Sequence, residues 1–97
     1  MQTFAEFKST LGDAVPPKGL TYQLEALWYD GAGNWEKSHE IVQDVNEKDA
    51  AWIHAYLHRK EGDPGNAQYW YSRAGKNMAG VSLEQEWKQL VEHFLKS

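Results

Sequence analysis

The strongest constraint on the fold is a pair of helical patterns on either side of a Gly-Asp-Pro-Gly break in residues 48–77. Before the break, Ala50 and Leu57 belong to an apolar set that recurs at the spacing of one helix face. After the break, Asp63 suits a helix N-cap, and Pro64 suits the first helical turn, where a missing N–H group costs no hydrogen bond. The stretch therefore predicts two helices that fold back on each other as a hairpin.

Small and aromatic residues recur through this hairpin in a recognisable order. They are Ala55 in the first helix, Gly62 and Asp63 at the turn, and Ala67, Tyr71 and Ala74 in the second helix. In this order the hairpin resembles a tetratricopeptide-type repeat. It departs from that family at His54 and His58, where a large apolar residue and a tyrosine are usual, and at Pro64, which replaces an aromatic residue.

An earlier stretch, residues 20–46, repeats half of the pattern. Ala26 and Tyr29 precede a Gly-Asn turn, and Ser38, Val42 and Val45 follow at the spacing of the equivalent residues in the second hairpin. The resemblance implies two tetratricopeptide-like hairpins within a single helical domain. The expected divisions of the domain, 1–97, are an N-terminal helix and linker (1–18), a first hairpin (19–46), a second hairpin (47–77) and a capping helix (82–97).

Capping signals mark the ends of further helices. Thr3 with Glu6, and Ser82 with Gln85, have the spacing of a capping box. A helix is expected from about residue 20 to residue 30, and the helices that follow are expected to start at Asn34, Asn46 and Asp63. No stretch shows the sustained alternation of a β-strand. The sequence therefore predicts an all-α fold of five or six helices.

Charge and composition exclude several classes of function. The formal net charge is −4 and the basic residues form no run, which argues against nucleic-acid or anionic-membrane surfaces, because those need clustered Lys and Arg. No stretch approaches 18 apolar residues, and the first residues lack the pattern of a signal peptide. The absence of cysteine excludes disulfides and fits a reducing compartment. We expect a cytoplasmic protein with neither a membrane nor a nucleic-acid partner.

Three histidines form the constellation with most chemical content. His54 and His58 are four residues apart and share a helix face, as in metal sites built on helices. His39 lies on the preceding helix, which packs against theirs in a tetratricopeptide-like arrangement. Glu36, Glu40 or Glu61 would then add a carboxylate or orient an imidazole ring. This hypothesis predicts a metal site, with zinc as the candidate ion.

Two other interpretations of the histidines stay open. The first is that they are packing residues on the edge and inner surface of the helices. The second is a polar ligand pocket in which Trp52, Tyr56 and Tyr69 join them. Most of the five Trp and five Tyr residues are expected in the core, because bulky side chains fill a small helical domain efficiently.

Other enzyme templates are missing, since the chain has no cysteine nucleophile, no Gly-x-Ser-x-Gly elbow and no Walker motif. A non-enzymatic role without a cofactor is favoured. The expected function is a small binding or scaffold module whose partner is a protein, a peptide or a second copy of the chain. The alternative is a metal-binding protein or metal-dependent hydrolase that uses His39, His54 and His58.

Overall fold

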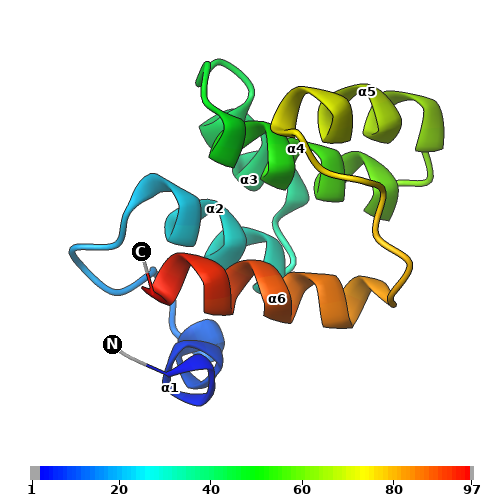
Figure 1. Cartoon of the computed structure of the whole chain (residues 1–97). Coiled ribbons are helices and arrows are strands. Elements are labelled where there is room, and N and C mark those ends of the chain that lie inside the picture. Colours follow the sequence, from blue (N-terminus) through cyan, green and yellow to red (C-terminus); the bar gives the residue numbers. More distant parts are fainter. Residues whose placement is uncertain (1–2, 97) are drawn as a thin grey trace.

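Six α-helices and one 3₁₀ turn form the regular structure of residues 3–96, the part of the chain that this computed structural model describes (Figure 1). The elements are α1 (Phe4–Ser9), the 3₁₀ turn (Thr10–Gly12), α2 (Tyr22–Gly31), α3 (Trp35–Val42), α4 (Lys48–Lys60), α5 (Pro64–Ala74) and α6 (Leu83–Lys96). Residues 3–96 contain no strand. The prediction of an all-α fold is confirmed.

The helices pack as two neighbouring pairs that are crossed by the last helix. Helix α2 packs along α3, and α4 packs along α5, each pair being joined by a short turn. Helix α6 runs across both α2 and α4, while α1 packs against α6 (Figure 1). Helix α4 thereby has α2, α3, α5 and α6 as neighbours, and this is why its buried residues lie on several faces.

The main core lies where α1, α2, α4 and α6 meet. Its largest fully buried apolar side chains are Phe7, Leu27, Trp28, Val42, Ile53, Leu57, Leu90 and Val91. A smaller cluster of Ala55, Ala67 and Tyr71 fills the interface between α4 and α5. Of the Trp and Tyr residues, Tyr69 alone is exposed, so the expectation that most of them are buried or packed against the core is confirmed.

Two buried carboxylates join the helices. Asp30, at the end of α2, accepts hydrogen bonds from the Tyr56 hydroxyl (3.0 Å) and the Lys60 ammonium (2.9 Å), both on α4. Glu86 of α6 accepts from the Arg59 guanidinium (2.8 Å) and from the Tyr71 hydroxyl (2.6 Å). Because each buried charge has an opposite charge and a hydroxyl as partners, both are satisfied and hold α4 in register with its neighbours.

Most predicted helix ends are confirmed. The side chains that accept the capping hydrogen bonds belong to Thr3, Asn34, Asp63 and Ser82. The prediction that Asn46 caps the fourth helix is wrong. Its amide oxygen instead accepts a hydrogen bond from Arg73 (3.2 Å), and Glu47 takes the N-cap position without a capping side-chain bond. Competition from an arginine on a neighbouring helix explains the difference.

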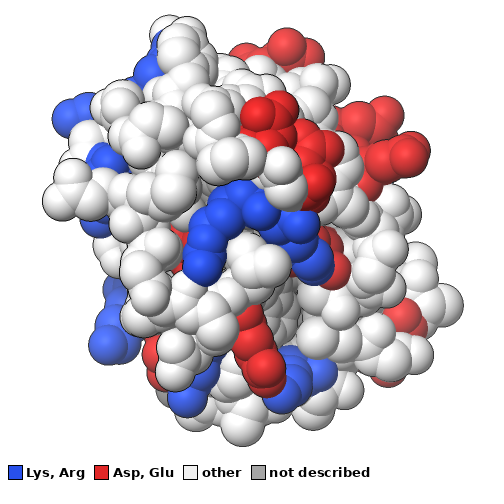
Figure 2. Space-filling model, turned by 90° about the vertical axis from the view of Figure 1, so that its right-hand side faces the viewer, with Lys and Arg blue, Asp and Glu red and all other residues white. Residues whose placement is uncertain are grey.

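Charges of both signs are interspersed on the surface. On the face drawn in Figure 2, lysines and arginines lie mainly at the left and centre, acidic residues gather at the upper right, and side chains of opposite charge lie beside each other at the centre and bottom. No helix within residues 3–96 has the length and apolar character needed to cross a bilayer.

Candidate metal centre

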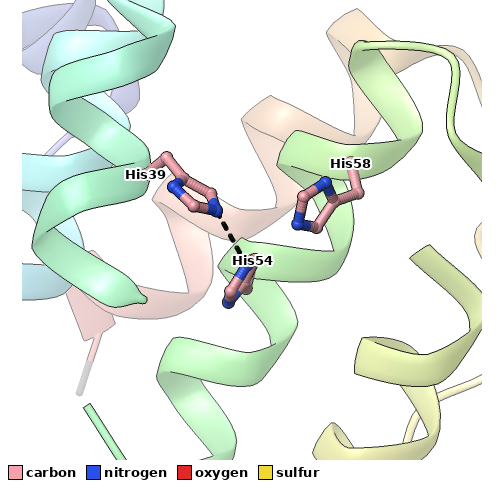
Figure 3. A group of neighbouring side chains, drawn as sticks. All are labelled: His39, His54 and His58. Carbon is pink, nitrogen blue, oxygen red and sulfur yellow. Dashed lines mark hydrogen bonds between the residues drawn. The ribbon is translucent and has the colours of Figure 1, made fainter. Parts of the chain in front are cut away.

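The structure brings the three predicted histidines together. His39 projects from α3, while His54 and His58 lie one turn apart on α4, and the three rings face a common gap (Figure 3). One ring nitrogen from each residue lies within 4.8 Å of those of the other two. The Nε2 atoms of His39 and His54 are 3.0 Å apart. We call these three residues the histidine cluster.

Local structure explains why α3 presents His39 to α4. The Asn34 side chain accepts a hydrogen bond from the Lys37 amide (3.1 Å) and starts α3 directly after a tight turn. The Trp35 indole N–H then donates to the carbonyl of Leu57 (2.8 Å), which fixes the first turn of α3 against α4. His39 follows Trp35 by four residues and therefore shares its face, toward α4.

Two indole rings enclose the histidine cluster. Trp35 stacks on His39, with ring centroids 4.9 Å apart and an interplanar angle of 10°. Trp70 of α5 stacks on His54 at 4.0 Å and 15°. Sequence reasoning missed both as parts of the site. The i,i+4 spacing of Trp35 and His39 is a signal that points to the first contact, whereas the Trp70 contact depends on how α5 packs.

The aromatic residues predicted for a ligand pocket lie elsewhere. Tyr56 is 2% exposed in the main core, where its hydroxyl binds Asp30. Trp52 packs its ring against His93 of α6, and Tyr69 is 54% exposed. Trp52 and Tyr56 are each two residues from His54, so they leave α4 about 200° away from it, and no ring contact described in residues 3–96 joins them to the histidine cluster.

A carboxylate sets the orientation of His58. Its Nδ1 lies 2.6 Å from Oε1 of Glu61, which ends α4, so the ring donates its N–H to this carboxylate. The Nε2 atom then carries the lone pair and is turned toward His39 and His54 (Figure 3). An imidazole held in this way by a carboxylate is the usual arrangement for a histidine that binds a metal through its other nitrogen. Of the three glutamates named from the sequence, Glu61 has this contact.

Burial favours the neutral, metal-binding form of His39 and His54. The pKa of His54 falls from its ordinary 6.5 to about 3, chiefly because of desolvation and in smaller part because of the neighbouring His39 and His58. Desolvation also lowers the pKa of His39, with a second contribution from His58. Neutral imidazole offers a lone pair to a cation, so at neutral pH these two rings are ready to act as ligands.

No protein-family model matches this chain, and neither a curated protein nor a solved structure matches it. The tetratricopeptide resemblance therefore stays a prediction.

The donor set, and the spacing of the His39 and His54 nitrogens, fit a divalent transition metal. Zinc binds imidazole nitrogens at about 2.0–2.1 Å in a tetrahedral arrangement, which places neighbouring ligand atoms roughly 3.3 Å apart. The 3.0 Å separation of the His39 and His54 nitrogens needs only a small widening to meet this value. In addition, the buried Nδ1 of His54 has no hydrogen-bond partner among the described residues. The cluster therefore contains a ring nitrogen that its own hydrogen bonds do not use.

Proposed function

We propose that this chain is a metal-binding protein that holds one divalent transition-metal ion with His39, His54 and His58. The observation that carries the proposal is the convergence of one nitrogen from each ring to within 4.8 Å. Imidazole donors suit zinc, copper, iron and nickel rather than magnesium or calcium, which prefer oxygen. The Glu61 carboxylate behind His58 supplies the outer hydrogen bond that orients such a ligand.

The ion's role in this proposal is structural. His39 belongs to α3, and the other two ligands belong to α4, so a bound ion connects the two helix pairs. A hydrolytic site, the alternative drawn from the sequence, needs a free ligand position with room for a substrate. The indoles of Trp35 and Trp70 instead pack on ring faces of the cluster. A hollow of about 500 Å³ does exist, but it lies on α1 and α6 and is lined by Phe4 and Trp87.

Isothermal titration of the untagged protein with zinc tests the proposal. The wild type is expected to bind one equivalent, and His39→Ala is expected to lose binding without loss of folding, because His39 is only partly buried. The matched control is His93→Ala, which removes the fourth histidine, on α6, and is expected to leave zinc binding intact. Equal zinc affinity in the wild type and His39→Ala would refute the assignment of ligands.

A second candidate function follows from the likeness of two turns. Gly33 has a φ value of +90° and Gly62 one of +88°. The N-cap after each glycine also has nearly the same conformation, with φ −112° and ψ 74° at Asn34 and φ −114° and ψ 77° at Asp63. These equal conformations, 29 residues apart, support our reading of α2–α3 and α4–α5 as two tetratricopeptide-like hairpins, with α6 as the cap. Such hairpins bind proteins or peptides in many arrays.

The place of α6 makes this second function the weaker proposal. Because α6 packs across α2 and α4, a partner would have to use the outer surfaces of α3 and α5. Sedimentation and pull-down with purified chain test it. A stoichiometric partner, or a second copy bound at micromolar concentration, supports a scaffold role, and a monomer that recovers no partner opposes it. The cytoplasmic location stays a prediction.

A further inference from the structure

Asn66 is a side chain of α5 that contacts the Nε2 atom of His58. Its backbone N–H donates to the Asp63 carboxylate (3.2 Å), so the first turn of α5 is fixed by its cap. The Asn66 carboxamide then faces α4, and its Nδ2 lies 3.4 Å from Nε2 of His58. This is the nitrogen that points to the gap between the other two histidines (Figure 3).

The hydrogen bonds of His58 define what Asn66 does without a metal. Because Nδ1 of His58 gives its proton to Glu61, Nε2 has a lone pair and accepts a hydrogen bond from the Asn66 amide. An ion that takes this lone pair removes the acceptor. A half-turn of the carboxamide then exchanges its oxygen and nitrogen with almost no change in shape, since the two atoms are nearly equal in size. The Asn66 oxygen would then lie about 3.4 Å from Nε2.

This distance fits a fourth ligand beside His58. Ligand atoms around tetrahedral zinc are roughly 3.3 Å apart. The pair His39 and His54 (3.0 Å) and the pair His58 and Asn66 (3.4 Å) both lie near that value. We infer that the carboxamide oxygen of Asn66 is the fourth ligand of the metal centre. The inference rests on the proposed metal-binding function and extends it to a closed site of three nitrogens and one oxygen.

A closed site has a definite consequence for the fold and the chemistry. With His39 on α3, His54 and His58 on α4, and Asn66 on α5, one ion connects three helices. All four positions are then filled by protein, which is the mark of a structural site rather than a catalytic one. Three imidazoles and one oxygen in a tetrahedral arrangement suit zinc best among the divalent ions that bind imidazole.

Zinc titration of three variants tests the inference. Asn66 is exposed overall, so its replacement should leave the fold intact. Asn66→Ala is expected to lower zinc affinity about tenfold or more. Asn66→Asp should keep or raise the affinity, because a carboxylate is a regular zinc ligand. Gln68→Ala, an exposed amide two residues further along α5, is the matched control and should bind zinc as the wild type does.

A spectroscopic measurement on the wild type gives a second, independent reading. In a ¹H–¹⁵N correlation spectrum, the side-chain NH₂ signals of Asn66 should shift with one equivalent of zinc, while those of Gln68 stay in place. Failure of the wild type to bind zinc would overturn both this inference and the proposed function. Normal zinc binding with unmoved Asn66 signals would overturn the fourth ligand alone, whether or not Asn66→Ala binds more weakly.

Discussion

Replacing His54 by phenylalanine separates the metal-binding role of this residue from its packing role. His54 is 5% exposed, and its ring stacks on Trp70 at 4.0 Å. Within residues 3–96, its Nδ1 has no hydrogen-bond partner, and its Nε2 bonds only to His39. A phenyl ring keeps the stack on Trp70 and removes both nitrogens. Zinc binding should therefore be lost, whereas the packing of the metal-free protein should be kept.

The expected change in stability can be worked out from these contacts. Removing a buried polar atom that has no partner relieves about 1–3 kcal/mol, and losing the bond to His39 costs about 0.5–1.5 kcal/mol. Metal-free His54→Phe should therefore lie between about 0.5 kcal/mol less stable and about 2.5 kcal/mol more stable than the wild type. Zinc at a hundred times its Kd should stabilise the wild type by about 2.7 kcal/mol. For a domain of this size, that raises Tm by roughly 10–20 °C.

Calorimetric melts of chelator-treated protein, with and without zinc, measure both quantities. We expect the zinc-dependent rise in Tm to vanish in His54→Phe and to persist in the control His93→Phe, which changes a histidine of α6 outside the cluster. A loss of more than about 2 kcal/mol in the metal-free variant would show instead that the imidazole is a packing and hydrogen-bonding group. A variant that keeps the wild-type response to zinc would show that His54 is not a ligand.

Three further predictions concern stability and pH. A Cβ on Gly31 would lie 2.6 Å from an indole carbon of α6, so Gly31→Ala should lower the free energy of unfolding in urea by about 1–3 kcal/mol. A Cβ on Gly12 would have no atom within 4 Å, so the control Gly12→Ala should unfold like the wild type. Tyr71→Phe removes a donor to a buried carboxylate and should cost about 1.5–3 kcal/mol, against less than about 0.5 kcal/mol for exposed Tyr69→Phe. Because burial lowers the pKa of His54 to about 3, the unfolded chain binds the extra proton between that value and 6.5. The stability that neutral His54 gives the metal-free fold should be complete above pH 6.5 and should be lost as the pH falls toward 3. In His54→Phe, the midpoint of urea unfolding should therefore change less with pH between 6.5 and 3.

The parts of the fold that sequence reasoning predicted are those set by nearby residues. Asn34 and Asp63 cap their helices because the amides they bind lie three residues ahead. The shared face of His54 and His58 follows in the same way from helical periodicity. His39 needed one further step, the packing of α3 on α4, and the structure places those helices in contact.

The errors arise where a distant residue decides the outcome. The Asn46 side chain accepts a hydrogen bond from Arg73, which is 27 residues away along the chain, instead of capping α4. Trp52 and Tyr56 sit on a helix that is buried on several faces, so apolar character alone does not say which face borders the histidines. Asn66 gave no signal of its own, because its approach to His58 depends on how α5 packs along α4.

X-ray absorption at the zinc edge shows directly whether imidazole rings bind the ion. The sample is untagged protein loaded with one equivalent of zinc and freed of excess metal by desalting. We expect a first shell of four nitrogen or oxygen atoms at about 2.0–2.1 Å, with the outer-shell scattering of three imidazole rings. Zinc that is lost on desalting, or a spectrum of hydrated zinc without imidazole scattering, would contradict a metal centre at His39, His54 and His58.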